Sequence, residues 1–177
     1  MKKLQKKDIN FFSLKELKNK KSELYNNTIE WLLHMKEESD GKAGPSFSRW
    51  IKKNLMREHP FDTYIIVERE YNRIIGIGSI LPDDQSVGKE LKIPGIWIGG
   101  IYIKKEDRGR GAGSLLVQHL ISRIQEASKN NNTIIRVNLF AHNPIAQHIY
   151  KKLGFIKIDD LTVYRDGFNC EVYYRKL

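Results

Sequence analysis

The sequence predicts an α+β fold in which a central mixed, mostly antiparallel sheet is flanked by helices. The first third of the chain carries apolar residues at helical spacing, and short apolar runs separated by turn residues follow from residue 61 onward. A glycine-rich turn also joins an apolar strand to an amphipathic helix. With 177 residues the chain has the length of one domain. We expect residues 1–177 to form that domain, with a helical N-terminal part at 1–60 and the core with a C-terminal hairpin at 61–177.

The N-terminal part predicts two helices. Apolar side chains recur at helical spacing from Leu14 to Met35, and Ser13 is placed to cap the first turn. Residues 38–46 are rich in turn-forming residues. A second helix is expected to begin at Ser46 and to end before Pro60.

The apolar pattern then changes to that of a sheet. Residues 61–70 and 73–81 predict two strands joined as an antiparallel hairpin, and the proline-containing stretch 81–95 predicts a loop. Residues 95–105 are apolar on both faces, which is typical of a central strand. Gly99 and Gly100 inside this strand indicate a bulge, or a backbone that another group approaches closely.

The last third of the chain alternates helices and strands. An amphipathic helix is expected from about Ser114 to Lys129, and a strand at 133–141 follows it. A short helix then has Asn143 as its N-cap, proline at its first position and a glycine just past its end. Residues 155–165 and 168–177 predict a closing hairpin that turns at Asp166-Gly167.

The composition excludes several kinds of site. Cys170 is the only cysteine, so the chain can form neither an internal disulfide nor a multi-cysteine zinc site. His142 and His148 lie six positions apart without a third ligand at helical spacing, and we expect no metal. No apolar run approaches the roughly 20 residues that cross a bilayer. The basic N-terminus also lacks the apolar stretch of a signal peptide. These features predict a cytoplasmic protein with no membrane partner.

Positive charge is concentrated near the N-terminus. The net charge is +10, and residues 1–21 carry eight lysines against Asp8 and Glu16. Such a segment fits an arm that binds nucleic acid or a membrane surface, or a solvated lysine-rich helix. Because the segment has no arginine and few aromatic residues, we favour the solvated helix and expect no nucleic-acid partner.

The strongest functional signal is the turn DRGRGAGS at residues 107–114. Three glycines between a buried strand and a helix leave backbone N–H groups unpaired at the helix start, where the helix dipole adds positive charge. Glycine also lets a phosphate approach these amides closely, and two arginines add charge. The pattern predicts a pyrophosphate site. It fits neither a Walker A loop nor the dinucleotide-binding glycine pattern.

Two motifs make the prediction more specific. The turn resembles the Q/R-x-x-G-x-G/A coenzyme A signature of the GNAT acetyltransferase superfamily, with Arg108 as its first residue. About thirty residues on, NPIAQHIYKKLGF at 143–155 resembles the second motif of that family, N-x-x-A-x-x-x-Y-x-x-x-G-F. The match covers roughly residues 61–160. It implies a GNAT-like acyl-CoA N-acyltransferase fold, acetyl-CoA (coenzyme A) as cosubstrate and no metal.

The resemblance also implies a set of cofactor-binding residues. Backbone amides of the turn would hold the pyrophosphate, the backbone of the preceding strand would pair with the pantetheine arm, and an asparagine side chain would contact the pantetheine. A backbone N–H in the same strand would polarise the acyl carbonyl. The implied set is Ile101, Tyr102, Ile103, Arg108, Gly109, Arg110, Gly111, Ala112, Gly113, Ser114 and Asn143.

Tyr150 is the implied catalytic residue, as the acid that protonates the leaving thiolate. The alternative interpretation is a core tyrosine, because Ala146, Ile149 and Leu153 are apolar neighbours on the same helix. A tyrosine hydroxyl titrates near ~10, so it keeps its proton at neutral pH and can donate it. Asn143 likewise has an alternative role as a helix cap, and its amide can serve both roles.

The residue that deprotonates the amine stays open. Some family members carry a strand glutamate about eleven residues before the first motif, and this chain has Trp97 there. Trp97 is interpreted as a core residue. Other candidates are Glu68, Asp83, Asp84 and Glu90, or a chain of water molecules. The last three lie in the loop before the central strand, where they could attract a cationic amine or be solvent-facing charges.

The sequence therefore predicts an acetyl-CoA-dependent N-acetyltransferase that acts on a primary amine of a small molecule or protein. No positioned nucleophile is evident, so the amine is expected to attack the thioester directly in a ternary complex. The alternative is a catalytically silent module that binds coenzyme A, nucleic acid or another partner. The acceptor amine stays open, and so does the oligomeric state, for which a homodimer is one option.

Overall fold

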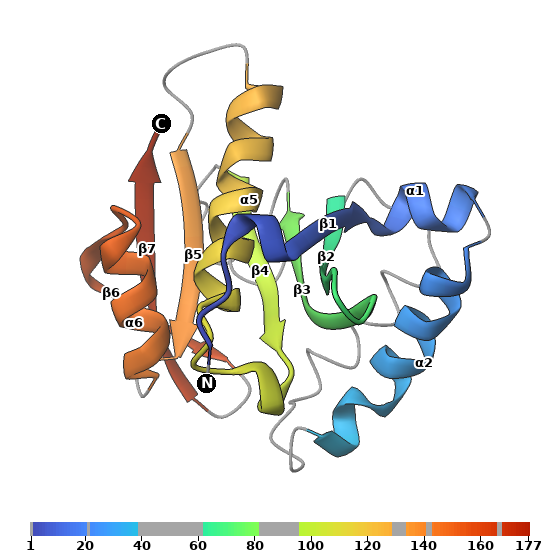
Figure 1. Ribbon diagram of the computed structural model, residues 1–177. Coiled ribbons are helices and arrows are strands. Elements are labelled where there is room, and N and C mark those ends of the chain that lie inside the picture. The colour runs from blue at the N-terminus through green and yellow to red at the C-terminus, as the bar shows by residue number, and fades with distance from the viewer. Residues whose placement is uncertain are drawn as a thin grey trace.

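The computed structural model describes residues 2–20, 22–38, 62–81, 96–128, 134–140, 143–165 and 168–177 (Figure 1). Its helical elements are the 3₁₀ turns η1 (Lys6–Asp8) and η2 (Lys105–Asp107) and the helices α1 (Leu14–Asn19), α2 (Glu23–Glu38), α5 (Ala112–Ala127) and α6 (Pro144–Lys152). Its strands are β1 (Ile9–Ser13), β2 (Asp62–Glu68), β3 (Arg73–Leu81), β4 (Ile96–Ile103), β5 (Ile134–Phe140), β6 (Ile156–Arg165) and β7 (Phe168–Lys176).

The described strands form one seven-stranded sheet in the order β1-β2-β3-β4-β5-β7-β6. Only β4 and β5 pair in parallel, and the other neighbours are antiparallel. The parallel pair is possible because α5 provides the crossover connection from β4 back to β5. The expected mixed, mostly antiparallel sheet with flanking helices is confirmed.

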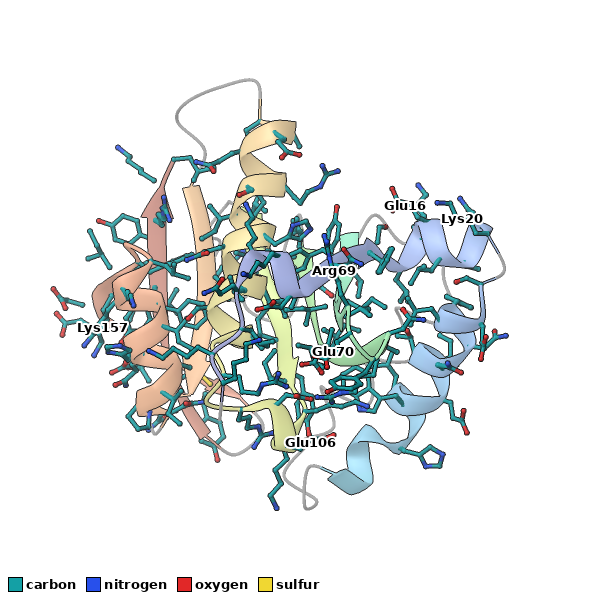
Figure 2. The ribbon with its side chains drawn as sticks, in the orientation of Figure 1. Glu16, Lys20, Arg69, Glu70, Glu106 and Lys157 are labelled. Atoms are coloured by element: carbon teal, nitrogen blue, oxygen red, sulfur yellow. The ribbon has the colours of Figure 1, made fainter. Side chains whose placement is uncertain are left out.

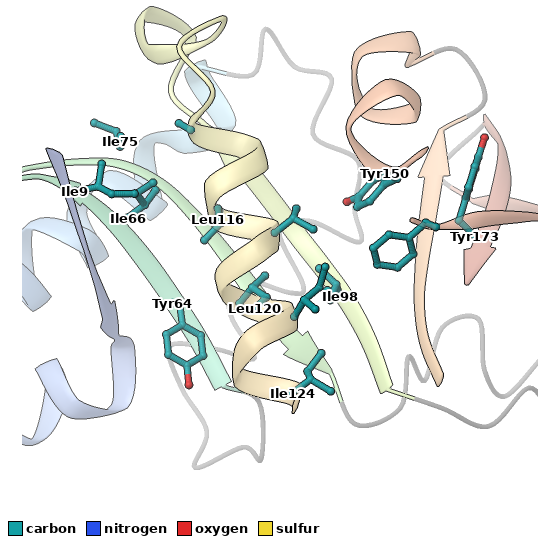
Figure 3. Packing of buried hydrophobic residues seen from close by; sticks show 14 residues of the cluster. Ile9, Tyr64, Ile66, Ile75, Ile98, Leu116, Leu120, Ile124, Tyr150 and Tyr173 are labelled. Carbon is teal, nitrogen blue, oxygen red and sulfur yellow. The ribbon is translucent and has the colours of Figure 1, made fainter. Parts of the chain in front are cut away.

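Alternating side chains of the strands pack under helices on both faces of the sheet. In β2, Ile66 packs against α5, whereas its neighbours Ile65 and Val67 pack with α1 and α2 on the other face. Helix α5 buries one stripe along its length, formed by Ala112, Leu116, Val117, Leu120, Ile121 and Ile124. Figure 3 shows this stripe between β4 and the side chains of Ile66 and Tyr64. Because α5 is anchored along its whole length, its N-terminus is fixed at the end of β4.

The first part of the chain differs from its prediction. Residues 9–13 form the edge strand β1, paired with β2 from Ile9↔Glu68 to Ser13↔Tyr64, where no strand was expected. The lysine-rich helix expected within residues 1–21 is therefore wrong for residues 9–13 and is confined to α1. Most lysines of residues 1–21 are exposed. The single helix expected from Leu14 is divided into α1 and α2. The Ser22 hydroxyl accepts a hydrogen bond from the Tyr25 amide at 3.2 Å and so starts the second helix.

The remaining elements follow the sequence pattern closely. The hairpin of β2 and β3 is confirmed, and so are the strands at 95–105 and 133–141 and the C-terminal hairpin. Helix α5 begins two residues earlier than expected, at Ala112, because Gly111 takes the N-cap position with φ of 90°. The expected helix at 46–59 and the turn at Asp166-Gly167 lie outside the described residues, and so does the expected loop at 81–95 except for Leu81, which ends β3.

His119 gives the packing of β1 on α5 a measurable pH dependence. Its ring stacks on Phe11 with centroids 4.1 Å apart and meets Tyr64 edge to face. Burial, with a smaller contribution from nearby Arg123, lowers the pKa of His119 to about 4. The unfolded chain would bind the proton near ~6.5. Between these values only the unfolded state is protonated, so the free energy of unfolding falls as the pH falls.

We therefore expect urea unfolding to show wild-type protein losing stability between pH 7 and pH 4.5 by more than the His119→Phe variant. Phenylalanine preserves the stacking and does not titrate, so the other acidic groups contribute equally to both curves. Parallel pH curves for the two proteins would show that the folded state does not depress the pKa of His119.

Candidate active site

Strands β4 and β5 diverge after three residues. Their parallel pairing covers Ile96, Trp97 and Ile98 of β4 and stops at Ile98↔Val137. From Gly99 to Ile103, β4 pairs with β3 on one side and with none of the other described strands on its second side. Among the described strands, β5 therefore covers this edge of β4 only as far as Ile98.

A β-bulge changes the direction of the β4 backbone at the point where β4 diverges from β5. Ile77 pairs with Tyr102 whereas Ser79 pairs with Gly99, so β4 holds one extra residue opposite β3. Gly100 takes φ of 60°, which is left-handed backbone that favours glycine. The bulge expected from the paired glycines is confirmed. Beyond it, Ile101 and Ile103 pack on the α5 face, and Tyr102 packs on the face of α1 and α2.

The glycine-rich turn follows β4 after the short η2 turn, and no side chain caps its backbone amides at the start of α5. Gly109 and Gly111 have φ of 76° and 90°, and a Cβ added at either position would meet nothing within 4 Å. No side chain caps α5, and the first backbone bond of the helix runs from the Leu115 amide to the Gly111 carbonyl. The N–H groups of the first turn before Leu115 therefore have no partner inside the helix. Such an arrangement suits an anion.

Helix α6 packs close to the same turn. An added Cβ at Gly113 would lie 3.6 Å from Ile149 Cδ1 and 3.7 Å from Ile103 Cγ1, so α6, the turn and the end of β4 meet at this point. The expected cap of α6 is confirmed, because Asn143 Oδ1 accepts a hydrogen bond from the Ala146 amide at 3.0 Å. The Asn143 side-chain NH₂ stays available as a donor.

Tyr150 lies on the inner side of α6. Its side chain is 7% exposed and its ring meets Phe155 edge to face at 5.4 Å. Figure 3 shows its hydroxyl pointing from α6 towards α5 and β4. Burial raises the pKa of Tyr150 above that of an exposed tyrosine, so the hydroxyl keeps its proton at neutral pH. Both interpretations of Tyr150 stay open, because the ring belongs to the core and the hydroxyl points towards α5 and β4.

The two arginines of the turn have different surroundings. Arg108 is exposed, its Nε donates to the Ile103 carbonyl at 3.1 Å, and its guanidinium lies 5.4 Å from the Tyr102 ring centroid. The Arg110 side chain is only 15% exposed and donates to Asp107 Oδ1 at 2.7 Å and to Glu68 Oε1. Arg108 has no carboxylate partner among the described residues, whereas the charge of Arg110 is neutralised internally.

The residues considered as candidates for the base have different surroundings in the structure. The two oxygens of Glu68 face Arg110 and Arg73, so this carboxylate is not placed to take a proton from an amine. Trp97 is 1% exposed and packs with Leu81, Cys170 and Val172 as the core residue it was expected to be. Asp83, Asp84 and Glu90 lie outside the described residues. Within the described ranges, no group of three or more His, Cys, Asp or Glu side chains could hold a metal ion.

The sequence did not reveal that Glu68, Arg73, Asp107 and Arg110 come together. Glu68 ends β2 and Arg73 begins β3, so the hairpin turn between them brings the two side chains to one end of the sheet. The η2 turn brings Asp107 to the same end. In Figure 2 the neighbouring residues Glu70 and Glu106 both lie in the lower half of the view. Asp107, the first residue of the glycine-rich turn, was the only feature of the local sequence that indicated such a cluster.

The fold and site define a class of protein: a mixed sheet in which two parallel strands diverge, followed by a glycine-rich turn at a helix N-terminus. The sequence profile of the Acetyltransferase (GNAT) family matches residues 23–155. The chain therefore belongs to the GNAT family, whose members are acetyl-CoA-dependent N-acetyltransferases. A comparison with curated proteins found no match.

Solved structures share the fold at low sequence identity. An acyl-CoA N-acyltransferase from Pseudomonas aeruginosa aligns with a TM-score of 0.63 and 15% identity over 95% of this chain and 98% of that one. Arabidopsis thaliana NAA60 in complex with acetyl-CoA aligns with a TM-score of 0.62 and 16% identity over 96% and 98%. Mutant forms of the spermidine/spermine N-acetyltransferase SpeG from Vibrio cholerae give 0.63 and 14% over 95% and 94%.

Among the described helices, none is long and apolar enough to cross a membrane.

The geometry of the turn generates a steric prediction. We expect Gly111→Glu to abolish binding of coenzyme A, because the new side chain would project into the open space before the amides and its negative charge would repel a pyrophosphate. Isothermal titration calorimetry measures the affinity. Gly154→Glu is the matched control, since Gly154 also has a positive φ, 79°, but lies at the far end of α6. Unaltered affinity in the Gly111 variant would remove this turn from the site.

Proposed function

We propose that this protein is an N-acetyltransferase that transfers the acetyl group of acetyl-CoA to a primary amine by direct attack in a ternary complex. The observation that carries the proposal is the divergence of β4 from β5 after Ile98, followed a few residues later by the glycine-rich turn, where a Cβ added at Gly109 or Gly111 would meet nothing within 4 Å. An extended pantetheine arm and a pyrophosphate are joined in the same order in coenzyme A. One molecule can therefore use both features together.

In this proposal the backbone of Ile101, Tyr102 and Ile103 pairs with the pantetheine as an added strand does. The amides of residues 109–114, including those of Ala112 and Ser114, bind the pyrophosphate. Arg108 contributes charge from an exposed position, and the free NH₂ of Asn143 donates to the pantetheine. A backbone N–H of the bulged part of β4 polarises the thioester carbonyl, where negative charge develops during the attack.

The chemical step needs a neutral amine and a donor for the leaving group. The amine nitrogen attacks the carbonyl carbon, the carbon–sulfur bond breaks, and the Tyr150 hydroxyl donates its proton to the thiolate. Only about one lysine-like amine in 2,500 is neutral at pH 7, which corresponds to roughly 4.6 kcal/mol. Because Glu68 is engaged by two arginines, we assign removal of the amine proton to a chain of water molecules or to an acid among residues 82–95.

Two aromatic contacts join helix α2 to the end of β4. Trp31 of α2 lies 6.0 Å from the Tyr102 ring, and Lys104 lies over the Trp31 ring at 5.0 Å. The helical N-terminal part therefore contacts the strand on which the pantetheine is proposed to lie. We propose that this part helps to choose among small-molecule and protein amines.

The proposal predicts thiol release that depends on both substrates. An amine panel with acetyl-CoA, followed with a thiol reagent, should give turnover with at least one amine and no acylated protein when the amine is omitted. Tyr150→Phe should lower kcat by about 10²- to 10⁴-fold while leaving the dissociation constant of coenzyme A unchanged, because only the proton donor is removed.

Tyr164→Phe is the matched control, because Tyr164 is 72% exposed on β6 and should keep full activity. Binding of coenzyme A without turnover on any amine would favour a silent binding module. A covalent acetyl-protein formed without amine would exclude direct transfer.

A further inference from the structure

Arg110 is held by both its side chain and its backbone. Its guanidinium donates to Asp107 Oδ1 and to Glu68 Oε1, and its carbonyl accepts a hydrogen bond from the Leu4 amide at 2.9 Å. The residues on either side of it, Gly109 and Gly111, have no side chains that could fix their conformation. A turn made of glycines loses much conformational entropy when it is ordered, so Arg110 is the side chain that can anchor it.

A second arginine, Arg73, contacts the same two carboxylates as Arg110. Arg73 donates to Asp107 through NH1 at 2.7 Å and NH2 at 2.6 Å, and its NH2 lies 2.9 Å from Glu68 Oε2. Both carboxylates are buried, Asp107 at 0% and Glu68 at 3% exposure. Two arginines thus neutralise two buried carboxylates and connect the hairpin of β2 and β3 to the glycine-rich turn. We call these four residues the arginine–carboxylate network.

Moving Arg110 to a phosphate would break this balance. Asp107 and Glu68 would then share Arg73 alone, and an incompletely paired buried charge is strongly destabilising. Arg108 faces no such constraint, because it has no carboxylate partner among the described residues and is exposed. The two arginines of the motif are therefore suited to different roles.

We propose, on the basis of the function proposed above, that Asp107 and Glu68 act through Arg110 as positioning residues that hold the glycine-rich turn open for the pyrophosphate, and that the Arg110 guanidinium is not a phosphate ligand. The network orders the turn before the cofactor arrives. The cofactor then binds without the entropic cost of ordering it.

The positioning role and direct phosphate binding predict different effects of one substitution on the affinity for coenzyme A. If the network positions the turn, Asp107→Asn should weaken coenzyme A binding by about tenfold or more, because the turn must then be ordered by the ligand. If Arg110 were a phosphate ligand, the same change would release its guanidinium and leave the affinity equal or higher. Calorimetric titration of the full-length protein with coenzyme A measures the difference.

Arg110→Lys gives a second separation that does not remove a carboxylate. Lysine keeps the charge and can bind phosphate, but it cannot bridge two carboxylates with a planar fork. Positioning predicts a loss about as large as that of Arg110→Met, whereas a phosphate ligand would be largely preserved. The double variant Asp107→Asn/Arg110→Met should bind no more weakly than the worse single variant, since both act through one network.

Amide hydrogen exchange in the ligand-free protein tests the network without any cofactor. The amides of Leu4 and Leu115 donate to the carbonyls of Arg110 and Gly111, and they should exchange severalfold faster in Asp107→Asn than in wild type. Glu126→Gln, which removes the carboxylate of the exposed Arg123–Glu126 ion pair near the other end of α5, is the matched control and should leave both amides and the affinity unchanged. Glu68→Gln replaces Asp107→Asn if that variant does not fold.

The outcomes are distinct. Unchanged exchange at both amides, or unchanged affinity in Asp107→Asn, overturns the positioning role. Wild-type protein that fails to bind coenzyme A overturns the proposed function, while the exchange measurement still decides whether the network holds the turn.

Discussion

The structure depends on the separation of two parallel strands. β4 and β5 are hydrogen-bonded at Ile96–Ile98 and then diverge, so β5 does not cover the second half of β4. Backbone groups at such an edge are costly unless solvent or a ligand satisfies them. The extra residue opposite β3 and the left-handed Gly100 turn the backbone at the same point. The proposed pairing of the pantetheine with β4 and the proposed polarisation of the thioester carbonyl both depend on this divergence.

The surrounding fold keeps the edge and the turn in fixed relation. Helix α5 is buried along one stripe, so the start of its first turn cannot move relative to β4. The arginine–carboxylate network connects the turn to the hairpin of β2 and β3, and the Leu4 amide adds a contact from the N-terminal segment. Anion binding by bare amides requires such order, because the groups contribute fully only when they already point at the ligand.

The sequence predicted local features well and long-range ones poorly. The hairpin of β2 and β3, the bulge at Gly99-Gly100 and the Asn143 cap each depend on residues close together in the chain, and all were predicted correctly. β1 was missed because its five residues gain stability only by pairing with β2, about fifty residues away. The engagement of Glu68 by Arg110 was missed for the same reason, since the two residues are 42 positions apart. The roles assigned to Tyr150 and to the turn amides stay predictions.

The most direct test of the β4 edge and the turn is a crystal structure with bound acetyl-CoA. The account predicts pyrophosphate oxygens within hydrogen-bonding distance, about 2.7–3.2 Å, of amide nitrogens in residues 109–114. It also predicts the pantetheine alongside β4 between Gly99 and Ile103. A cofactor bound elsewhere, with the turn unoccupied or covered by side chains, would contradict it.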